Sequence, residues 1–295
     1  MSTQYGNPKG HGESTDFTPY IIDQGWQNYT SEEHGTWQIL YNRQRELLKG
    51  RACNEFLENM DKLGIGDKEI PDFKKMSATL KELTGWEVVA VPGLIPDLPF
   101  FQMLSERKFP AGHFIRSRAQ LDYIQEPDVF HDVFGHVPLL AHPVFADYLE
   151  AYGRGGLRAH EFGTIANLAR LYWYTVEFGL INTPEGLRIY GAGILSSSGE
   201  SCFSLEDASP NRIGFDLKRV MQTKYRVDDY QQTYFVIDSF DQLFRETYQD
   251  FAPLYDALKG QPRELAPGEI TAADHVIHQG TQAYALLRNM KEQSA

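Results

Sequence analysis

One long apolar segment constrains the fold of this chain more than any other feature. It covers residues 167–180 and reads NLARLYWYTVEFGL. An apolar run with helical spacing has to be buried, so it predicts a central core helix within residues 164–179. Its single acidic residue, Glu177, falls on the same helix face as Ala169 and Trp173, which precede it by eight and four residues.

The carboxylate of Glu177 needs a partner on this buried face. Burying a charged group is costly unless a cation or hydrogen-bond donors meet it. The residues alone leave two interpretations open. Glu177 is either a metal ligand or one half of an ion pair with an arginine such as Arg170 or Arg188.

A second segment, EPDVFHDVFGHVP at residues 126–138, carries two histidines five positions apart. On a regular α-helix this separation turns the two side chains about 140° away from each other. The sequence predicts a break that removes this difficulty, because Gly135 suits a left-handed C-terminal cap and Pro138 blocks continuation of the helix. We therefore expect His131 on a helix and His136 folded back just beyond the end of that helix, so that both imidazoles reach one ion.

Two imidazoles and one carboxylate are a ligand set that serves more than one metal. The set forms the facial triad of oxygen-activating Fe(II) sites, and it also holds catalytic zinc. The motif is not the HExxH pattern of zinc proteases, since the spacing is five and Asp132 stands where that pattern has glutamate. His131, His136 and Glu177 are predicted metal ligands and the catalytic centre. An iron oxygenase, a zinc hydrolase and a catalytically silent helical binding protein stay open at this point.

The remaining pattern predicts one compact, mainly α domain with a few short β-strands. Residues 1–28 are polar and rich in glycine, serine, threonine and proline, and predict a flexible tail. Residues 29–260 are expected to form the catalytic domain, with 261–295 a less regular C-terminal segment packed on or trailing from it. Within the domain, Thr30 and Glu33 have the spacing of a helix capping box. Helices are expected at 52–63 and 71–83, a strand at 87–91, and a strand followed by a helix from residue 234.

Charge and composition argue against several classes of partner. The chain has 295 residues and a net charge of −12, which disfavours nucleic-acid binding. No apolar run approaches the roughly 18 residues of a membrane span, and the first residues contain no apolar core of a secretory signal. Its two cysteines, Cys53 and Cys202, follow no zinc or redox spacing. We expect a cytoplasmic protein with neither nucleic-acid nor membrane partners.

Five segments resemble the pterin-dependent aromatic amino acid hydroxylases, in order and at matching separations. Three are close matches: EPDVFHDVFGHVPLL, ARLYWYTVEFGL and YGAGILSSSGE. Two are looser, VAVPGLIPDLPFF and YFVIDSF. The resemblance runs from about Tyr29 to about Leu254, is strongest to the short bacterial members that act on phenylalanine, and implies the family's catalytic-domain fold. The chain lacks the heptad-patterned C-terminal helix of the animal tetramers, so a monomer is expected.

The resemblance implies hydroxylation of L-phenylalanine to L-tyrosine by O2, with Fe(II) and a tetrahydropterin (tetrahydrobiopterin or a related pterin). It assigns the iron to His131, His136 and Glu177. The residues implied beside the pterin are Gly93, Leu94, Ile95, Phe100, Asp132, Ala169 and Tyr172. Those implied around the substrate are Arg116, Tyr123, Pro127, Trp173, Phe178, Gly193, Ser196 and Val227. Phe100 would stack on the pterin, and the planar guanidinium of Arg116 would clamp the substrate carboxylate.

Three positions bear on specificity and on departures from the family pattern. Val227 falls where tyrosine hydroxylases carry aspartate, and an apolar side chain there favours phenylalanine. Asp132 replaces a glutamate of the animal members, so its pterin contact is expected to be longer or water-mediated. Ile124 replaces a threonine near the substrate carboxylate, so Arg116 is expected to bind that carboxylate without the threonine hydroxyl. Hydroxylation of tryptophan or tyrosine stays an alternative.

Overall fold

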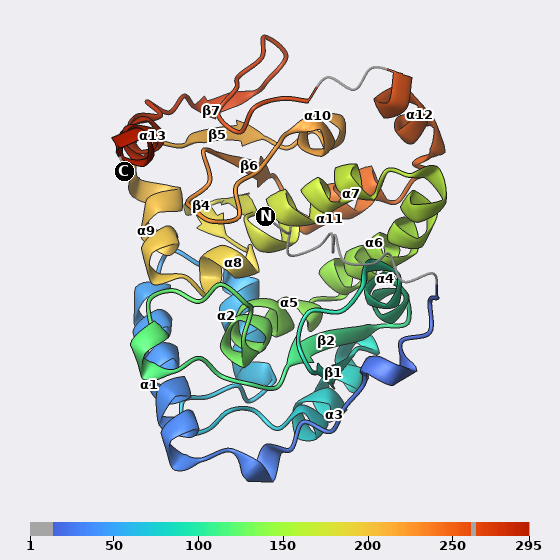
Figure 1. Cartoon of the computed structure of the whole chain (residues 1–295), viewed down its shortest axis with the longest axis vertical. Helices are drawn as coiled ribbons and strands as arrows, with labels where there is room; N and C mark the ends of the chain where they lie inside the picture. The colour runs from blue at the N-terminus through green and yellow to red at the C-terminus, as the bar shows by residue number, and fades with distance from the viewer. Residues whose placement is uncertain (1–13, 261–263, 295) are drawn as a thin grey trace.

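Helices make up most of the molecule, as predicted (Figure 1). The computed structural model describes residues 14–260 and 264–294. The α-helices are α1 (Ser31–Leu47), α2 (Asn54–Lys62), α3 (Phe73–Thr84), α4 (Asp97–Ser105), α5 (Val137–Leu140), α6 (Pro143–Phe162), α7 (Ile165–Tyr172), α8 (Ala192–Leu195), α9 (Ser198–Glu206), α10 (Leu217–Gln222), α11 (Phe240–Thr247), α12 (Ala252–Gly260) and α13 (Ala283–Ser294). Two π-helices, η4 (Phe130–His136) and η5 (Trp173–Glu177), carry the three predicted metal ligands.

The strands form two small sheets. A parallel pair joins β1 (Glu87–Val91) to β2 (Lys108–Gly112). A five-stranded sheet has the order β4-β3-β6-β5-β7. Its strands are β3 (Leu180–Thr183), β4 (Gly186–Ile189), β5 (Asn211–Gly214), β6 (Thr233–Ile237) and β7 (Val276–His278). In Figure 1 the larger sheet lies in the upper half and the β1–β2 pair in the lower half, with α5 and α8 between them.

The central helix predicted within residues 164–179 is present. α7 continues directly into η5, and every residue from Leu168 to Glu177 is buried. Its aromatic side chains pack against α6, where Tyr152 lies 5.2 Å from Tyr172 between ring centroids. This element therefore fixes the middle of the core and positions Glu177 inside it.

Short sequence patterns correctly predicted several other helices and a strand. The Thr30 hydroxyl accepts a hydrogen bond from the Glu33 backbone N–H at 3.2 Å, and the Glu33 carboxylate accepts one from the Thr30 N–H at 2.7 Å. The expected strand at 87–91 is β1, and the helices expected at 52–63 and 71–83 are α2 and α3, shifted by at most two residues.

The N-terminal segment is attached to the domain well before residue 29, so the expectation of a flexible tail over 1–28 is wrong for its last part. Ile22 pairs antiparallel with Ala90 of β1, and the Trp26 indole donates to the Ile70 carbonyl at 2.7 Å. Both partners are distant in sequence, so composition gives no sign of them. Residues 1–13 lie outside the described residues.

The C-terminal segment is more regular than expected for residues 261–295. β7 pairs antiparallel with β5, and α13 follows it. β7 has only three residues, so it gives little periodic pattern in the sequence. α13 is held by long-range contacts that the sequence does not show, such as the hydrogen bond that Tyr284 Oη donates to Asp229 at 2.8 Å. Among the described helices, none has the length and apolar character needed to cross a membrane. The domain limits at 28 and 260 stay predictions.

Candidate metal centre

Three side chains from two π-helices meet in the protein interior. The Nε2 atoms of His131 and His136 lie 3.2 Å apart. Glu177 Oε1 is 3.2 Å from His136 Nε2, and its Oε2 is 3.6 Å from His131 Nε2. Lone pairs that converge in this way are stabilised by a cation placed between them, so the donor set fits a divalent metal. In residues 14–260 and 264–294, no other three His, Cys, Asp or Glu residues come together in this way.

A π-helix aligns the two histidines. In η4 the i→i+5 hydrogen-bond pattern places residues five apart almost above one another, which brings His131 and His136 together. Gly135 is not left-handed, and the chain runs on into α5 through Pro138, so the predicted helix break is wrong. Gly135 is needed for a close approach instead, because a β-carbon there would lie 2.9 Å from the Ala192 carbonyl oxygen.

Glu177 ends the second π-helix and is 2% exposed. Neither arginine considered as an ion-pair partner reaches it. Arg170 pairs with Glu264 at 2.6 Å, and Arg188 donates to the Leu187 carbonyl at 2.8 Å. The geometry therefore favours the metal interpretation over the ion-pair interpretation.

Hydrogen bonds set the tautomer of His131. Ser196 Oγ donates to the Ala192 carbonyl at 2.8 Å and lies 2.9 Å from His131 Nδ1. Because the Ser196 hydroxyl proton is already donated to the Ala192 carbonyl, Ser196 Oγ accepts a hydrogen bond from His131 Nδ1–H. Nε2 of His131 then keeps its lone pair for a metal. Burial lowers the pKa of His131 to about 4, against the opposing charge of Glu177, so the imidazole is neutral at pH 7.

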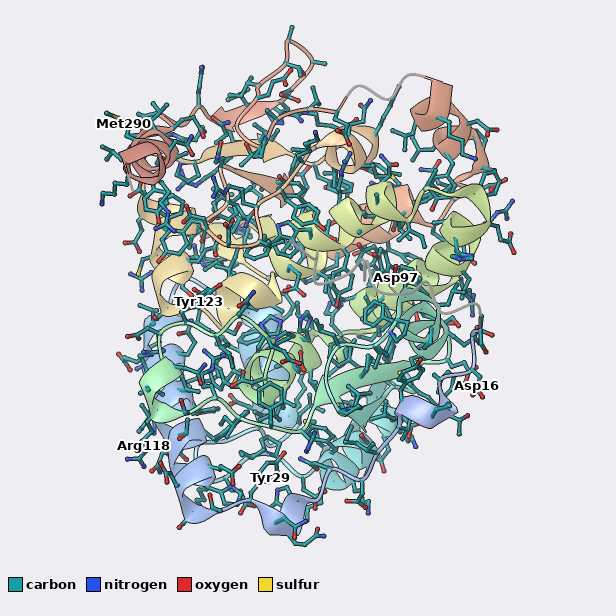
Figure 2. All side chains as sticks on the ribbon, in the orientation of Figure 1. Asp16, Tyr29, Asp97, Arg118, Tyr123 and Met290 are labelled. Carbon is teal, nitrogen blue, oxygen red and sulfur yellow. The ribbon has the colours of Figure 1, made fainter. Side chains whose placement is uncertain are left out.

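A cavity of about 420 Å³ opens beside His131 and Glu177. One wall is aromatic and closely packed: the Trp173 ring stacks 4.3 Å from Tyr225 and lies 4.8 Å from Phe178. All eight residues predicted around the substrate line this cavity, namely Arg116, Tyr123, Pro127, Trp173, Phe178, Gly193, Ser196 and Val227. Tyr123 is 63% exposed and lies towards the left edge of the molecule in Figure 2.

Asp128 holds Arg116 in place. Arg116 Nε and Nη2 each donate to this carboxylate at 2.8 Å, and the Arg116 backbone N–H donates at 2.9 Å. Burial alone would raise the pKa of Asp128, but the hydrogen bonds and charge of Arg116 lower it below its ordinary value. The two-point pairing fixes the guanidinium plane. Spacing in the sequence does not reveal this role of Asp128, because its pairing with Arg116 is set by the fold.

A second, smaller pocket shares Pro127 with the cavity. It is lined by six of the seven residues predicted beside the pterin, namely Gly93, Leu94, Ile95, Phe100, Asp132 and Tyr172. Burial raises the pKa of Asp132 to about 7, although the charge of His136 and the Gly112 backbone N–H, which donates at 2.7 Å, lower it. The structure does not bring Ala169 to this pocket; it is buried in α7.

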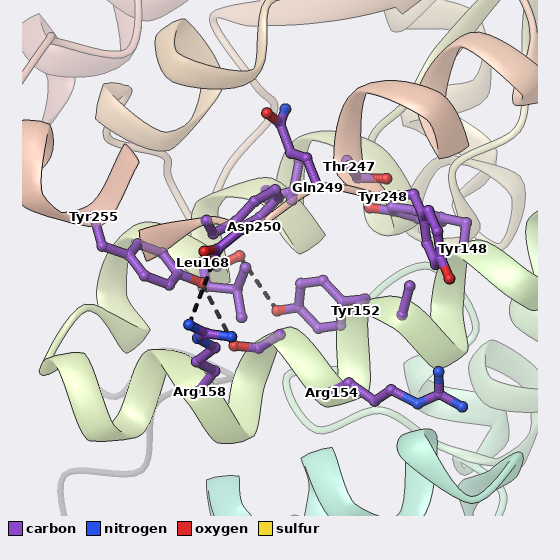
Figure 3. A pocket seen from close by; sticks show the side chains of 14 residues that line it. Tyr148, Tyr152, Arg154, Arg158, Leu168, Thr247, Tyr248, Gln249, Asp250 and Tyr255 are labelled. Carbon is purple, nitrogen blue, oxygen red and sulfur yellow. Dashed lines mark hydrogen bonds and ion pairs between the residues drawn. The ribbon is translucent and has the colours of Figure 1, made fainter. Parts of the chain in front are cut away.

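A separate cavity of about 380 Å³ contains neither a metal ligand nor a predicted site residue. Figure 3 shows side chains from α6 and from the segment after α11 around it. Tyr152 Oη donates to the Leu168 carbonyl at 3.3 Å, and Arg158 lies 3.3 Å from the Asp250 carboxylate. Nothing in the sequence pattern indicated this cavity.

Comparisons with known proteins agree with this geometry. Residues 25–293 match the family described as biopterin-dependent aromatic amino acid hydroxylase. The phenylalanine-4-hydroxylase of Caulobacter vibrioides is 60% identical over 266 residues, 90% of each chain. That of Chromobacterium violaceum is 56% identical over 272 residues, 92% of this chain and 91% of the relative. A solved structure of the Chromobacterium protein with iron and phenylalanine superposes with a TM-score of 0.85 at 55% identity, covering 90% of this chain and 97% of that one.

Proposed function

The chain belongs to the biopterin-dependent aromatic amino acid hydroxylases, and from that premise we propose how its residues carry out the reaction. Its activity is phenylalanine 4-monooxygenation, which converts L-phenylalanine to L-tyrosine with O2 and a tetrahydropterin at a non-haem Fe(II). The observation that carries the site assignment is the convergence of two imidazoles and one carboxylate beside the larger cavity, which His131 and Glu177 line. The zinc hydrolase and the silent binding protein have no comparable support.

His131, His136 and Glu177 are the proposed iron ligands. Their donor set and burial fit a divalent metal, which they would hold beside the larger cavity. When bound, iron and reduced pterin together activate O2 for transfer of one oxygen atom to an aromatic ring. Ser196 keeps the His131 ring in the tautomer that presents Nε2.

The cavity suits an amino acid with a bare aromatic ring. Arg116 Nη1 makes no hydrogen bond with the described residues, so it is available for the substrate carboxylate while Asp128 holds the other edge of the guanidinium. Trp173 and Phe178 offer an aromatic wall for the ring and help to exclude water. Val227 offers no polar group to a phenol hydroxyl, which favours phenylalanine over tyrosine. Tyr123, Pro127 and Gly193 complete the proposed substrate site.

The smaller pocket is the proposed pterin site. Phe100 offers an aromatic face to a flat heterocycle, and the backbone of Gly93, Leu94 and Ile95 offers polar groups to its edge. Asp132, with a pKa near 7, can accept or donate a hydrogen bond there. Tyr172 closes the pocket, while Ala169 acts on it only through the packing of α7.

We also propose that the protein acts as a monomer in the cytoplasm. Cys53 and Cys202 are both free thiols, as is usual in a reducing compartment. Light scattering tests the assembly state. A dimer lost on changing the exposed Leu286 and Met290 of α13 to serine would contradict the monomer.

Reconstitution under anaerobic conditions tests the function. Metal-free protein is loaded with Fe(II) or Zn(II), then given O2, tetrahydrobiopterin and phenylalanine, tryptophan or tyrosine. We expect tyrosine from phenylalanine with Fe(II) alone. Turnover with Zn(II) but not Fe(II), or faster hydroxylation of tryptophan or tyrosine than of phenylalanine, would overturn the assignment.

A further inference from the structure

We propose that Gln231 is a positioning residue that fixes the aromatic wall of the substrate cavity through the indole N–H of Trp173. The inference rests on the proposed function of that cavity. Gln231 is 2% exposed and lines the cavity together with Trp173. It lies two residues before the first residue of β6, in a buried stretch of chain that leads into that strand.

The carboxamide of Gln231 joins two segments that line the cavity. Its Oε1 accepts the indole N–H of Trp173 at 3.0 Å. Its Nε2 donates to the carbonyl oxygens of Arg226 and Asp229, at 2.8 and 3.3 Å. These two carbonyls bracket Val227, so one side chain holds both the aromatic wall and the turn that carries the predicted specificity residue.

A buried acid fixes Gln231 in turn. Glu200 Oε1 accepts a hydrogen bond from the Gln231 backbone N–H at 3.3 Å and another from Tyr234 Oη at 2.7 Å. Glu200 lies on α9 and Tyr234 on β6, so the carboxylate ties the start of the strand to a neighbouring helix. Gln231 therefore has a defined position before it meets Trp173.

The indole N–H is the only polar group of Trp173, so it is the natural point at which to control the ring. Stacking against Tyr225 and contact with Phe178 restrict the ring plane but allow it to slide within that plane. A hydrogen bond at the ring edge removes this freedom. Misplacement of a reacting ring by about 1 Å can cost roughly a hundredfold in rate, so a fixed wall matters for placing the substrate.

An NMR experiment tests the contact without reference to activity. The chain has four tryptophans, and the indole N–H groups of Trp26, Trp37 and Trp86 donate to backbone carbonyls. In Gln231→Met only one of the four indole cross-peaks should move upfield, and Trp173→Phe should identify it by removing it. Four unchanged cross-peaks would overturn the proposal. If Gln231→Met fails to fold, Gln231→Asn, which shortens the side chain, gives the same readout.

A double-mutant cycle tests the positioning role. Gln231→Met should raise KM for phenylalanine, lower the fraction of oxidised pterin that yields tyrosine, and reduce kcat/KM by about tenfold. In a Trp173→Phe background the same change should cost at most about threefold, because the indole partner is already absent. Equal losses in the two backgrounds would show that Gln231 does not act through Trp173.

Asn211→Leu serves as the matched control. Asn211 is 1% exposed on β5, and its amide donates to Thr233 and Gly268. It lines neither the cavity nor the smaller pocket. This control should lower the melting temperature but leave KM and the pterin coupling unchanged. Wild-type protein that makes no tyrosine would refute the proposed function, whereas the indole spectra would still decide whether Gln231 holds Trp173.

Discussion

The Nε2 atoms of His131 and His136 lie 3.2 Å apart because a π-helix places residues five positions apart on one face. An α-helix would direct these two side chains about 140° apart. The second π-helix ends at Glu177, so both elements that supply the proposed ligands depart from regular α geometry at the candidate metal centre. Their wider turns are what allow three donors to converge inside a closely packed core.

Metal binding should stabilise the folded protein. If Fe(II) binds the three proposed ligands in the folded protein and not the unfolded chain, saturating metal at about 100 times Kd should add about 2.7 kcal/mol to the free energy of unfolding. Glu177→Ala should abolish this gain and the binding of one iron per chain. Glu185→Ala, at a carboxylate outside the centre, should retain both. An unchanged thermal shift in Glu177→Ala would contradict the ligand assignment.

Gly135→Ala should destabilise the protein by about 1–3 kcal/mol. The added methyl group would lie 2.9 Å from the Ala192 carbonyl and push η4 away from α8, which also carries the acceptor for Ser196. Gly155→Ala, inside α6 with nothing within 4 Å of the added carbon, should instead stabilise by roughly 0.5–1 kcal/mol. Chemical denaturation compares the two variants. Equal effects would show that Gly135 is not required for close packing.

Arg116→Ala should lower stability by about 3–5 kcal/mol, since it leaves the buried Asp128 carboxylate without its partner. Adding Asp128→Asn should recover part of that loss but should not restore the KM for phenylalanine. Denaturation and steady-state kinetics separate the two effects. A normal KM in either variant would remove Arg116 from the substrate site.

Glu200→Gln should change how stability depends on pH. Burial raises the pKa of Glu200 to about 7, despite hydrogen bonds from Tyr234 and Gln231 that lower it. A pKa raised above the unfolded value means that the folded state binds the extra proton, so this group costs stability as pH rises from about 4.5 to 7. The glutamine can accept the same hydrogen bonds and avoids the cost. Its advantage over the wild type should grow across this window to about 3 kcal/mol and then level off. A constant difference between pH 4.5 and 8 would contradict the shifted pKa.

Local patterns in the sequence predicted the parts of the fold that depend on near neighbours. The Thr30–Glu33 cap needs only four residues, and β1 needs only a short β-branched run, so both are predictable. The π-helices could not be predicted in this way. Helices are read from the sequence by α-helical spacing, whereas the switch to i→i+5 hydrogen bonds depends on tertiary packing. The attachments of Ile22 and of α13 depend on partners far along the chain, which spacing cannot reveal.

In the candidate site too, some residues could be predicted from the sequence and others depend on tertiary contacts. The ligand types His131, His136 and Glu177 could be chosen from motif and apolar context, and resemblance supplied the residues of both pockets. Asp128 and Gln231 could not be chosen, because their significance lies in hydrogen bonds to Arg116 and Trp173 that only the folded chain reveals.

The source of the oxygen atom in the product tests the central claim most directly. Iron-loaded protein is incubated with phenylalanine and tetrahydrobiopterin under ¹⁸O2 in ordinary water, and the tyrosine is analysed by mass spectrometry. A monooxygenase should place one ¹⁸O atom in the tyrosine hydroxyl, and His136→Ala should give no labelled product. Absence of tyrosine from the wild type, or tyrosine whose hydroxyl oxygen comes from water, would contradict it.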